Sequence, residues 1–390
     1  MTIDECKILI VEHICDKYES RWPDRVPKVF MYISLDFLAI NGACPIDREL
    51  LIKSALSDLS SVMHFCLEEK GACLRIKFFI NNENLEASYS YLDRRMPEER
   101  ISELFEEIRK LDIKSPCLID AMNDSTWLYT NLPMKDSVCT ISLLKLLDFC
   151  LVNSFDVHYR KLSALILGDS KAYEKMHLAP KLARLLHLFS HLDCSDDEIL
   201  RVYGICKTPE IFELTGSFEI CRRDGSVYDF SFFKNAGLLS SNELDDISCF
   251  ISHAHRVVFY ENIASYYEAL KHRKENEIIV FEAGFFGYGR KRLFSLLYES
   301  GNDMEFCHSG DIDAGGFDIF VQLKRIIPVL IPKDMDIATI NANRDKAKML
   351  TDSDRKRLDA QLEDSEYVYF HDVIEFMLEQ NIKFEQENWT

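Results

Sequence analysis

The stretch HSGDIDAGGFDIF, His308 to Phe320, joins an apolar run to a helical segment and carries two aspartates one residue apart. Asp311 and Asp313 stand between a glycine and a glycine pair. In extended backbone, residues two apart point to the same side, so both carboxylates can face one spot. The same pair can also form a turn and cap the following helix. The surrounding pattern therefore has to decide between a structural and a metal-binding interpretation.

From Arg256 onward, apolar runs alternate with helical segments. The apolar runs are RVVFYEN, EIIVFEAGFFGYG, DMEFCHSGDID and VLIPKD, and the segments between them are IASYYEALKHRK, RKRLFSLLYES and GGFDIFVQLKRIIP. Nearly continuous apolar strands that alternate with helices indicate a parallel sheet covered on both faces. Right-handed crossovers place the carboxyl ends of all strands at one edge, where such sheets bind their ligands.

Acidic residues follow these strands at the predicted edge. Glu261 ends the first run, and Asp311 and Asp313 end the third. Carboxylates that meet at one place repel each other unless they share a cation, and hard oxygen ligands in that number suit Mg²⁺ or Mn²⁺. Such ions activate water and hold the leaving oxygen in phosphodiester cleavage. Glu282 also ends a run and is a candidate instead of, or besides, Glu261.

A glutamate after one strand and a DxD after a later strand resemble the pattern of Toprim domains, which occur in topoisomerases, primases and some nucleases. The segments VVFYEN, IIVFEAGFFGYGRKRLFSLL, SGDIDAGGFDIFVQL and FEQENW are similar to the C-terminal domain of the Wadjet JetD family. Upstream, GDSKAYEK resembles a GDSK segment of the same family. The resemblance covers residues from about 155 to 390 and leaves the first 150 residues without a match.

The resemblance implies a Toprim domain like that of the topoisomerase VI A-subunit. It implies a metal-dependent DNA nuclease that works as a homodimer and cuts plasmid double-stranded DNA chosen by an SMC-type condensin complex. It assigns Glu261, Asp311 and Asp313 as metal-binding and catalytic acids. Some relatives carry a further aspartate after the DxD, but Gly315 stands there in this chain, which leaves the ligands of a second metal open.

Basic residues offer candidate contacts to DNA phosphate. Arg290, Lys291 and Arg292 open a helix after a glycine-rich turn, where backbone N–H groups and cations can hold phosphate. Lys171, in the GDSK segment, is a further candidate. For all four residues, a solvated charged surface is the alternative interpretation.

Other polar residues have mainly structural interpretations. Tyr266 and Tyr267 are expected to pack within a helix, so hydrolysis is expected rather than a covalent DNA intermediate. Glu385 and Glu387 match the family's EQE, and a surface tail is the alternative. His187 and His191 share a helical face, but they lack a third ligand for zinc. The 13 scattered cysteines are expected to be reduced thiols.

The first 150 residues mix helical and strand patterns. Helical spacing in DECKILIVEHICDKYESR predicts one buried face, formed by Ile8, Leu9, Val11, Ile14 and Cys15. RELLIKSALSDLSSVMHFCLEE is expected to continue as helix, and GACLRIKFFINNENLEASYSYLD to form a hairpin with NNEN as its turn. Helices followed by a hairpin resemble a winged-helix arrangement.

Residues 151 to 250 form a connecting region. A turn is predicted at Gly168, and SFEICRRDGSVYDFSFF is predicted to be a hairpin because Asp224-Gly225 supplies its turn. Ser240 and Glu243 are predicted to form a capping box. The chain is thus expected to hold an α+β domain at 1–150, an α+β connection at 151–250 and an α/β Toprim-like catalytic domain at 251–390.

The charge composition of the chain bears on how the protein binds DNA. Lys and Arg number 46 against 65 Asp and Glu, for a net charge of −19. Such a chain is not expected to bind DNA tightly by itself. We expect a partner to deliver the protein to its DNA substrate, and residues 1–150 are the candidate domain for docking to that partner. The sequence has neither an apolar run long enough to span a membrane nor a signal-peptide pattern, so a cytoplasmic protein is expected.

Two other classes of function fit parts of the pattern. A phosphatase of the haloacid dehalogenase type also places DxD after a strand, but it favours a more apolar strand than EFCHSG and Thr or Val where Gly315 stands. A non-catalytic adaptor that binds DNA or a partner through a relic site is the other alternative, and failure to bind Mg²⁺ would favour it.

Overall fold

The computed structural model describes residues 1–22, 26–35, 45–70, 73–190, 192–252, 254–301 and 303–386. The chain divides into two compact units. The N-terminal unit is Met1–Asp112 with Pro133–Ser137, and the C-terminal unit is Ile113–Leu132 with Val138–Thr390. The boundaries expected at residues 150 and 250 stay predictions. Within the described ranges, no helix is long and apolar enough to cross a membrane.

The N-terminal unit packs helices against a small antiparallel sheet of order β1-β3-β2. Its elements are α1 (Ile3–Glu19), β1 (Phe30–Ser34), α2 (Pro45–Leu59), β2 (Phe65–Lys70), β3 (Cys73–Phe79), α3 (Asn82–Tyr91) and α4 (Pro97–Arg109). Helix α1 is confirmed, but its predicted face is partly wrong, because Ile8 and Leu9 are 43% and 39% exposed. The buried stripe repeats every three or four residues through Ile10, Ile14 and Tyr18, and positions 8 and 9 lie beside it.

The predicted hairpin with an NNEN turn is wrong. Strand β3 pairs with β2, which precedes it, so the expected long helix ends at Leu59 and the chain then turns into a strand. The NNEN segment begins α3 instead, because the Asn81 side chain accepts a hydrogen bond from the Asn84 N–H and caps the helix. The winged-helix arrangement stays a prediction.

The C-terminal unit begins with helices and short strands. They are α5 (Pro116–Met122), α6 (Ser125–Asn131), α7 (Ser137–Val152), β4 (Val157–His158), α8 (Tyr159–Leu167), α9 (Ala172–Lys175), α10 (Leu178–Ser190), α11 (Asp196–Val202) and β5 (Ile205–Cys206). The turn predicted at Gly168 is confirmed, since this residue ends α8 with a φ of 76°.

A small antiparallel sheet of order β10-β7-β8 follows, built from β7 (Phe218–Arg222), β8 (Val227–Asp229) and β10 (Ile247–Ser252). The hairpin at Asp224-Gly225 is confirmed, with Gly225 at a φ of 87°. The capping box is wrong. Ser240 caps the short 3-10 helix Ser241–Asp246 through the Asn242 N–H, while Glu243 forms an ion pair with Arg222.

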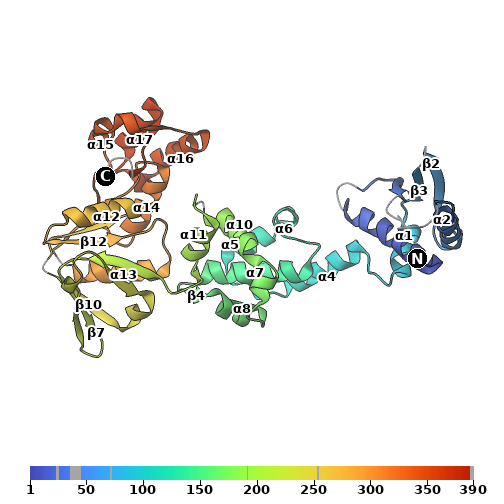
Figure 1. The fold of residues 1–390 in the computed structure, drawn as a ribbon, viewed down its shortest axis with the longest axis horizontal. Coiled ribbons are helices and arrows are strands. Elements are labelled where there is room, and N and C mark those ends of the chain that lie inside the picture. The colour runs from blue at the N-terminus through green and yellow to red at the C-terminus, as the bar shows by residue number, and fades with distance from the viewer. Residues whose placement is uncertain are drawn as a thin grey trace. The chain divides into compact units, whose positions relative to one another are not determined.

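The predicted parallel sheet is confirmed as part of a six-stranded sheet of order β14-β13-β11-β12-β6-β9. Its parallel strands are β11 (Arg256–Tyr260), β12 (Glu277–Phe281), β13 (Glu305–Ser309) and β14 (Ile331–Pro332), and β6 (Ile211–Thr215) and β9 (Gly237–Ser240) extend it antiparallel. The connecting helices are α12 (Ile263–His272), α13 (Tyr288–Ser300) and α14 (Ala314–Lys324). Figure 1 shows β12 of this sheet between α12 and α13.

Alternation along the strands separates two apolar faces of this sheet. Val257 and Phe259 face the main core, which includes residues of α13 and α14. Val258 and Tyr260 face a smaller cluster with Tyr266 of α12. Residues after α14 form α15 (Ile337–Ala342), β15 (Lys348–Met349), α16 (Asp352–Leu362), α17 (His371–Gln380) and β16 (Ile382–Lys383).

Candidate active site

The acidic residues singled out in the sequence follow neighbouring parallel strands. Phe259 of β11 lies opposite Val280 of β12 and His308 of β13. The ladder continues past the strands, because the Glu282 N–H donates to the Tyr260 carbonyl at 2.8 Å and the Glu261 N–H donates to the Ser309 carbonyl at 3.1 Å. The carboxyl ends of the three strands thus bring Glu261, Glu282 and the DID segment to one edge of the sheet.

Glu261 lies closest to the DID segment. Its Oε2 accepts a hydrogen bond from the Asp311 N–H at 3.1 Å. Burial raises the pKa of Glu261 well above its usual value, and the negative charges of Asp311, Asp313 and Glu282 raise it further. The half-buried Glu261 carboxylate therefore lies among negative charges at the sheet edge.

Asp311 links the sheet edge to the end of the described chain. Its Oδ1 accepts a hydrogen bond from the Gln386 N–H at 2.5 Å. Next to it, Ile312 and Phe384 exchange two backbone hydrogen bonds, at 3.0 and 3.1 Å. The Gln386 side chain also donates to the Ser309 hydroxyl at 2.7 Å. The segment after β16 therefore packs directly beside the DID motif.

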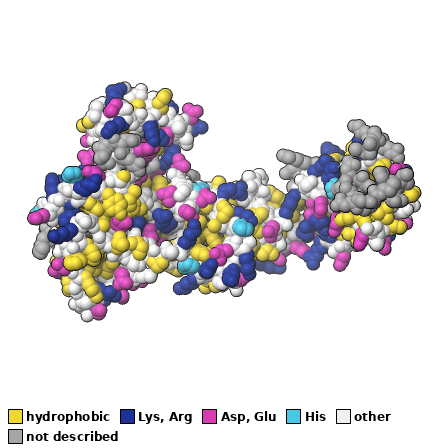
Figure 2. All heavy atoms as spheres, viewed as in Figure 1, with side chains coloured by type: hydrophobic (Ala, Val, Ile, Leu, Met, Phe, Trp, Pro, Cys, Tyr) yellow, Lys and Arg dark blue, Asp and Glu magenta, His cyan; other side chains and the backbone are white. Residues whose placement is uncertain are grey.

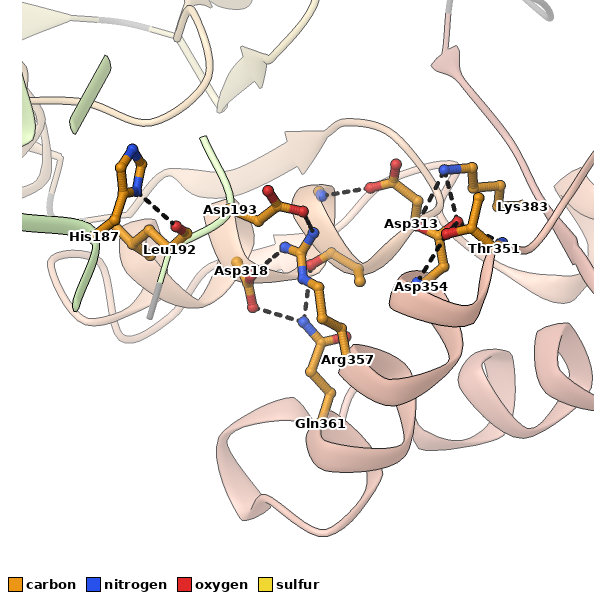
Figure 3. Close-up of polar contacts among 12 residues, drawn as sticks. His187, Leu192, Asp193, Asp313, Asp318, Thr351, Asp354, Arg357, Gln361 and Lys383 are labelled. Carbon is orange, nitrogen blue, oxygen red and sulfur yellow. Dashed lines mark hydrogen bonds and ion pairs between the residues drawn. The ribbon is translucent and has the colours of Figure 1, made fainter. Parts of the chain in front are cut away.

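Asp313 caps helix α14, so the capping interpretation is confirmed for this residue. Its Oδ1 accepts a hydrogen bond from the Gly316 N–H at 2.9 Å. Burial raises the pKa of Asp313, whereas that hydrogen bond and the charges of Lys383 and Arg357 act in the opposite direction. Figure 3 shows Asp313 near the ion pair of Lys383 with Asp354.

Arg357 belongs to a polar cluster on the side of α14 and α16. Its guanidinium donates to Asp318 at 2.8 Å and to Asp193 at 2.7 Å, and Gln361 donates to Asp318 at 2.6 Å (Figure 3). This cluster fixes α16 against α14 and holds positive charge within electrostatic reach of Asp313.

A histidine–glutamate pair completes the edge; Glu282 is one of the acids singled out from the sequence, whereas His308 is not. His308 Nδ1 lies 2.8 Å from Glu282 Oε2, and both side chains are 0% exposed. His308 Nε2 and Glu282 Oε1 are buried without a hydrogen-bond partner. Strand alternation could have found the pair, because His308, Glu261 and Glu282 stand two residues after the inward-facing Phe306, Phe259 and Val280.

The arrangement shows donors that suit a divalent cation, but it does not show a formed ligand set. Among the described residues, no three His, Cys, Asp or Glu side chains are placed to hold a metal ion. The Asp311 and Asp313 oxygens named above accept backbone hydrogen bonds instead. Even so, the raised pKa of Glu261 and the buried polar atoms without a partner on His308 and Glu282 are what a cation at this edge would relieve.

The structure corrects one of the predicted DNA contacts. Arg290 is only 5% exposed, forms an ion pair with Glu210 at 3.2 Å and donates to the Phe281 carbonyl at 2.9 Å. It closes the core behind β12 and is not a surface cation. Lys291 is half-buried, and burial lowers its pKa. Arg292 and Lys171 are exposed, so their contacts to DNA stay predictions.

The remaining candidates have other partners or lie outside the described residues. Tyr266 is fully buried, which agrees with the predicted helix packing, whereas Tyr267 is 47% exposed and donates to Glu213. Glu385 forms an ion pair with Lys348, and Glu387 lies outside the described residues. His187 is paired with Asp196, while His191 is also outside the described residues. The cysteine side chains that the structure describes form no disulfide, as expected of reduced thiols.

Comparison with known proteins finds similarity over the C-terminal unit. Residues 239–389 match the family described as Wadjet protein JetD, C-terminal. A Wadjet protein JetD from Bacillus cereus (strain Q1) is 27% identical over 235 residues, which cover 58% of this chain and 56% of the relative. The match thus spans about half the length of that protein. The segment that carries Glu261, Glu282, Asp311 and Asp313 is thus similar to the C-terminal domain of Wadjet JetD proteins.

Proposed function

We propose that the protein is a metal-dependent DNA endonuclease with a Toprim-like catalytic domain. In this proposal it acts as a homodimer in plasmid defence and hydrolyses double-stranded plasmid DNA that an SMC-type condensin complex selects. The similarity of residues 239–389 to the JetD C-terminal family supports the class of partner and substrate. The chemistry is argued from the sheet edge, because that edge gathers the acids of this chain.

The observation that carries the proposal is the concentration of carboxylates after three adjacent parallel strands. Glu261 is half-buried beside Asp311, Asp313 and Glu282, and desolvation together with these negative charges raises its pKa well above its usual value. Repulsion among these carboxylates does not stabilise the folded protein. A bound divalent cation would compensate their charges, so the repulsion favours cation binding. Mg²⁺ and Mn²⁺ prefer oxygen donors of this kind.

Each acid has a separate part in the proposed chemistry. Glu261 and Asp311 would hold the cation, because the Glu261 carboxylate already contacts the Asp311 backbone. Asp313 would contribute as a further ligand, while its Oδ1 keeps α14 in place. A cation held by these residues would supply a nucleophilic water and stabilise the leaving oxygen. Because Tyr266 is buried and Tyr267 is paired with Glu213, no tyrosine nucleophile is assigned here.

The charge of the chain bears on how DNA reaches the site. A net charge of −19 opposes binding to a polyanion, and autonomous phosphate contacts weaken steeply as salt rises. Figure 2 shows Lys and Arg side chains gathered over α8, and exposed Arg160, Lys161, Lys171 and Lys175 lie on α8 and around α9. We assign this basic patch to positioning DNA that a partner delivers.

The test incubates supercoiled plasmid with the full-length protein, with and without Mn²⁺ or Mg²⁺ and with and without the neighbouring SMC-type complex. The expected result is metal-dependent cleavage that is weak for the protein alone at about 150 mM salt, where charges are strongly screened, and stronger with the complex. Asp311→Asn serves as the inactive control.

Two outcomes would replace the proposal. Turnover of a small phosphate ester without DNA cleavage would support the phosphatase alternative. DNA or partner binding without any turnover, and without Mg²⁺ binding at millimolar concentration, would support an adaptor. Efficient cleavage by the protein alone at about 150 mM salt would keep the nuclease assignment but refute delivery by a partner.

A further inference from the structure

Two cysteines lie directly opposite each other on neighbouring strands of the small antiparallel sheet. In the register of β7 with β10, Cys221 is the partner of Cys249. The two thiols are also joined by a side-chain hydrogen bond. Other described strand cysteines face different residues, such as Lys77 opposite Cys66. The β7–β10 pair therefore brings together two groups that can react with each other.

A β-bulge creates this pairing. Ile247 lies opposite Arg222, and the register then shifts by one residue, so that Cys249 instead of Ser248 lies opposite Cys221. Bulges of this kind redirect the side chains that follow them and are over-represented next to functional sites. The Ser248 hydroxyl donates to the Cys221 carbonyl at 2.9 Å, which holds the extra residue against β7.

The cysteine pair lies on the outer face of the small sheet. Ile220 and Phe250, which are neighbours of the two cysteines along the strands, are buried in the main core. Because side chains alternate along a strand, the thiols point to the opposite face, and both cysteines are half-buried. Val227 of β8 lies next to Cys221 in the sheet and is 54% exposed. Small oxidants therefore have access to this face.

The spacing of opposite residues suits a disulfide. Cα atoms of such residues on antiparallel strands are about 4.5–5.5 Å apart, and a disulfide spans about 4.4–6.8 Å. Their Cβ atoms are about 4.5–5.5 Å apart, against about 3.5–4.5 Å in a disulfide. Closing the bond thus draws the strands together and strains it, and strained, accessible disulfides are the readily reduced ones.

The reduced form is favoured until an oxidant is present. Desolvation and the hydrogen bond with Cys249 raise the pKa of the Cys221 thiol. Only a small part of this thiol is therefore ionised at neutral pH, and the thiolate is the form that reacts with oxidants.

We propose that Cys221 and Cys249 are a redox modification site that forms a reversible cross-strand disulfide when a hydroperoxide oxidises it. This inference is independent of the proposed nuclease activity. One thiolate attacks an oxygen of the hydroperoxide, so that an S–O bond forms, the O–O bond breaks and an alcohol leaves, or water in the case of hydrogen peroxide. The other thiol then attacks the sulfenic sulfur, so that the S–S bond forms, the S–O bond breaks and water leaves. The two thiols lose two electrons and two protons, and the hydroperoxide is reduced.

The disulfide would close a chain segment that connects two sheets. Residues 222–248 contain β8 of the small sheet and β9, the edge strand of the six-stranded sheet. Strand β10 is in turn attached to α13, because the Phe250 N–H donates to the Ser300 hydroxyl at 2.9 Å. A cross-link between Cys221 and Cys249 restricts the unfolded chain, so oxidation should raise Tm by about 5–10 °C.

The experiment treats the full-length protein with hydrogen peroxide, alkylates the remaining thiols with iodoacetamide and maps the peptides by mass spectrometry without reduction. Trypsin places Cys221 in peptide 208–222 and Cys249 in peptide 235–256, and neither peptide has another cysteine. We expect the two peptides to be joined, with a mass two hydrogens below their sum, and to separate with dithiothreitol. Thermal unfolding should show the rise in Tm and its reversal by dithiothreitol.

Cys221→Ser and Cys249→Ser should each abolish the joined peptide and the rise in Tm. Cys66→Ser is the matched control, because Cys66 is an exposed strand cysteine that lies opposite Lys77. This variant should keep both effects. If a β7 or β10 variant does not fold, the peptide map of the natural protein still decides the question.

The peptide map also defines the results that count against the inference. Separate sulfinic or sulfonic acids on the two peptides, or a bond from either peptide to a different cysteine, would overturn it. Joined peptides without a rise in Tm would support the modification site and refute its effect on stability.

Discussion

Gly310→Ala is expected to disable the site with a limited loss of stability. The added Cβ would stand 2.4 Å from Glu261 Oε2 and 2.6 Å from His308 Nε2, closer than non-bonded atoms can approach. Both atoms are at the ends of side chains, so they can move while the strands stay in place. Overpacking of this kind destabilises folded proteins by about 1–3 kcal/mol, which lowers Tm by about 2–4 °C per kcal/mol in a domain of this size class.

The assays for Gly310→Ala are thermal unfolding, Mn²⁺ titration and plasmid cleavage. Metal affinity and cleavage should fall at least ~10-fold, as for other changes that displace the supports of a ligand. Gly315→Ala is the matched control, since its Cβ would meet only Asp313 Oδ1, at 3.3 Å. That control should keep cleavage with little change in Tm, because the gain from alanine in the first turn of α14 is offset by its close contact with Asp313 Oδ1. Full metal affinity and cleavage in Gly310→Ala would refute the reasoning.

Three further predictions concern the charges of the C-terminal unit. Asp311→Asn should abolish cleavage without lowering Tm in chelator, because it removes one of the charges that raise the Glu261 pKa; a clear loss of Tm would refute this. Arg290→Met should destabilise the protein by about 3–5 kcal/mol in denaturant unfolding, because it leaves the charge of Glu210 buried without its partner; reduced DNA binding at unchanged stability would restore Arg290 as a DNA contact. In chelator, the contribution of Glu261 to stability should be fully present below its usual pKa of 4.5 and lost as pH rises through the higher folded pKa, so Glu261→Gln should flatten this part of the stability–pH curve.

The fold around the acids could be predicted because its determinants are local. Apolar strands of about five residues, separated by helical segments, specify a parallel sheet, and the carboxyl-end rule then places Glu261 and the DID segment at one edge. The Asp224-Gly225 turn is equally local, because a glycine at positive φ forms it wherever the flanking strands go. Both predictions depended on neighbours in sequence, and the structure confirms both.

Predictions failed where a distant partner decided the structure. The Gln386 N–H donates to Asp311 of the DID motif from 75 residues away in sequence, and no periodic pattern predicts that hydrogen bond. Arg290 was read as a surface cation because its partner, Glu210, lies 80 residues upstream. The NNEN segment was read as a turn because β2, the true partner of β3, looked like a continuing helix. In each case tertiary contacts overrode the local preference.

The buried Glu282–His308 pair occupies two positions of the sheet edge at which apolar residues would pack better. Strand alternation places both side chains on the inner face, at positions two residues beyond Val280 and Phe306, where an apolar pair would continue the core. Replacing buried charged pairs with well-packed apolar residues is often neutral or stabilising. This chain instead holds a glutamate and a histidine there, each with a buried atom that lacks a hydrogen-bond partner. Polar groups at that position give up stability that an apolar pair would give the fold, so packing alone does not explain them.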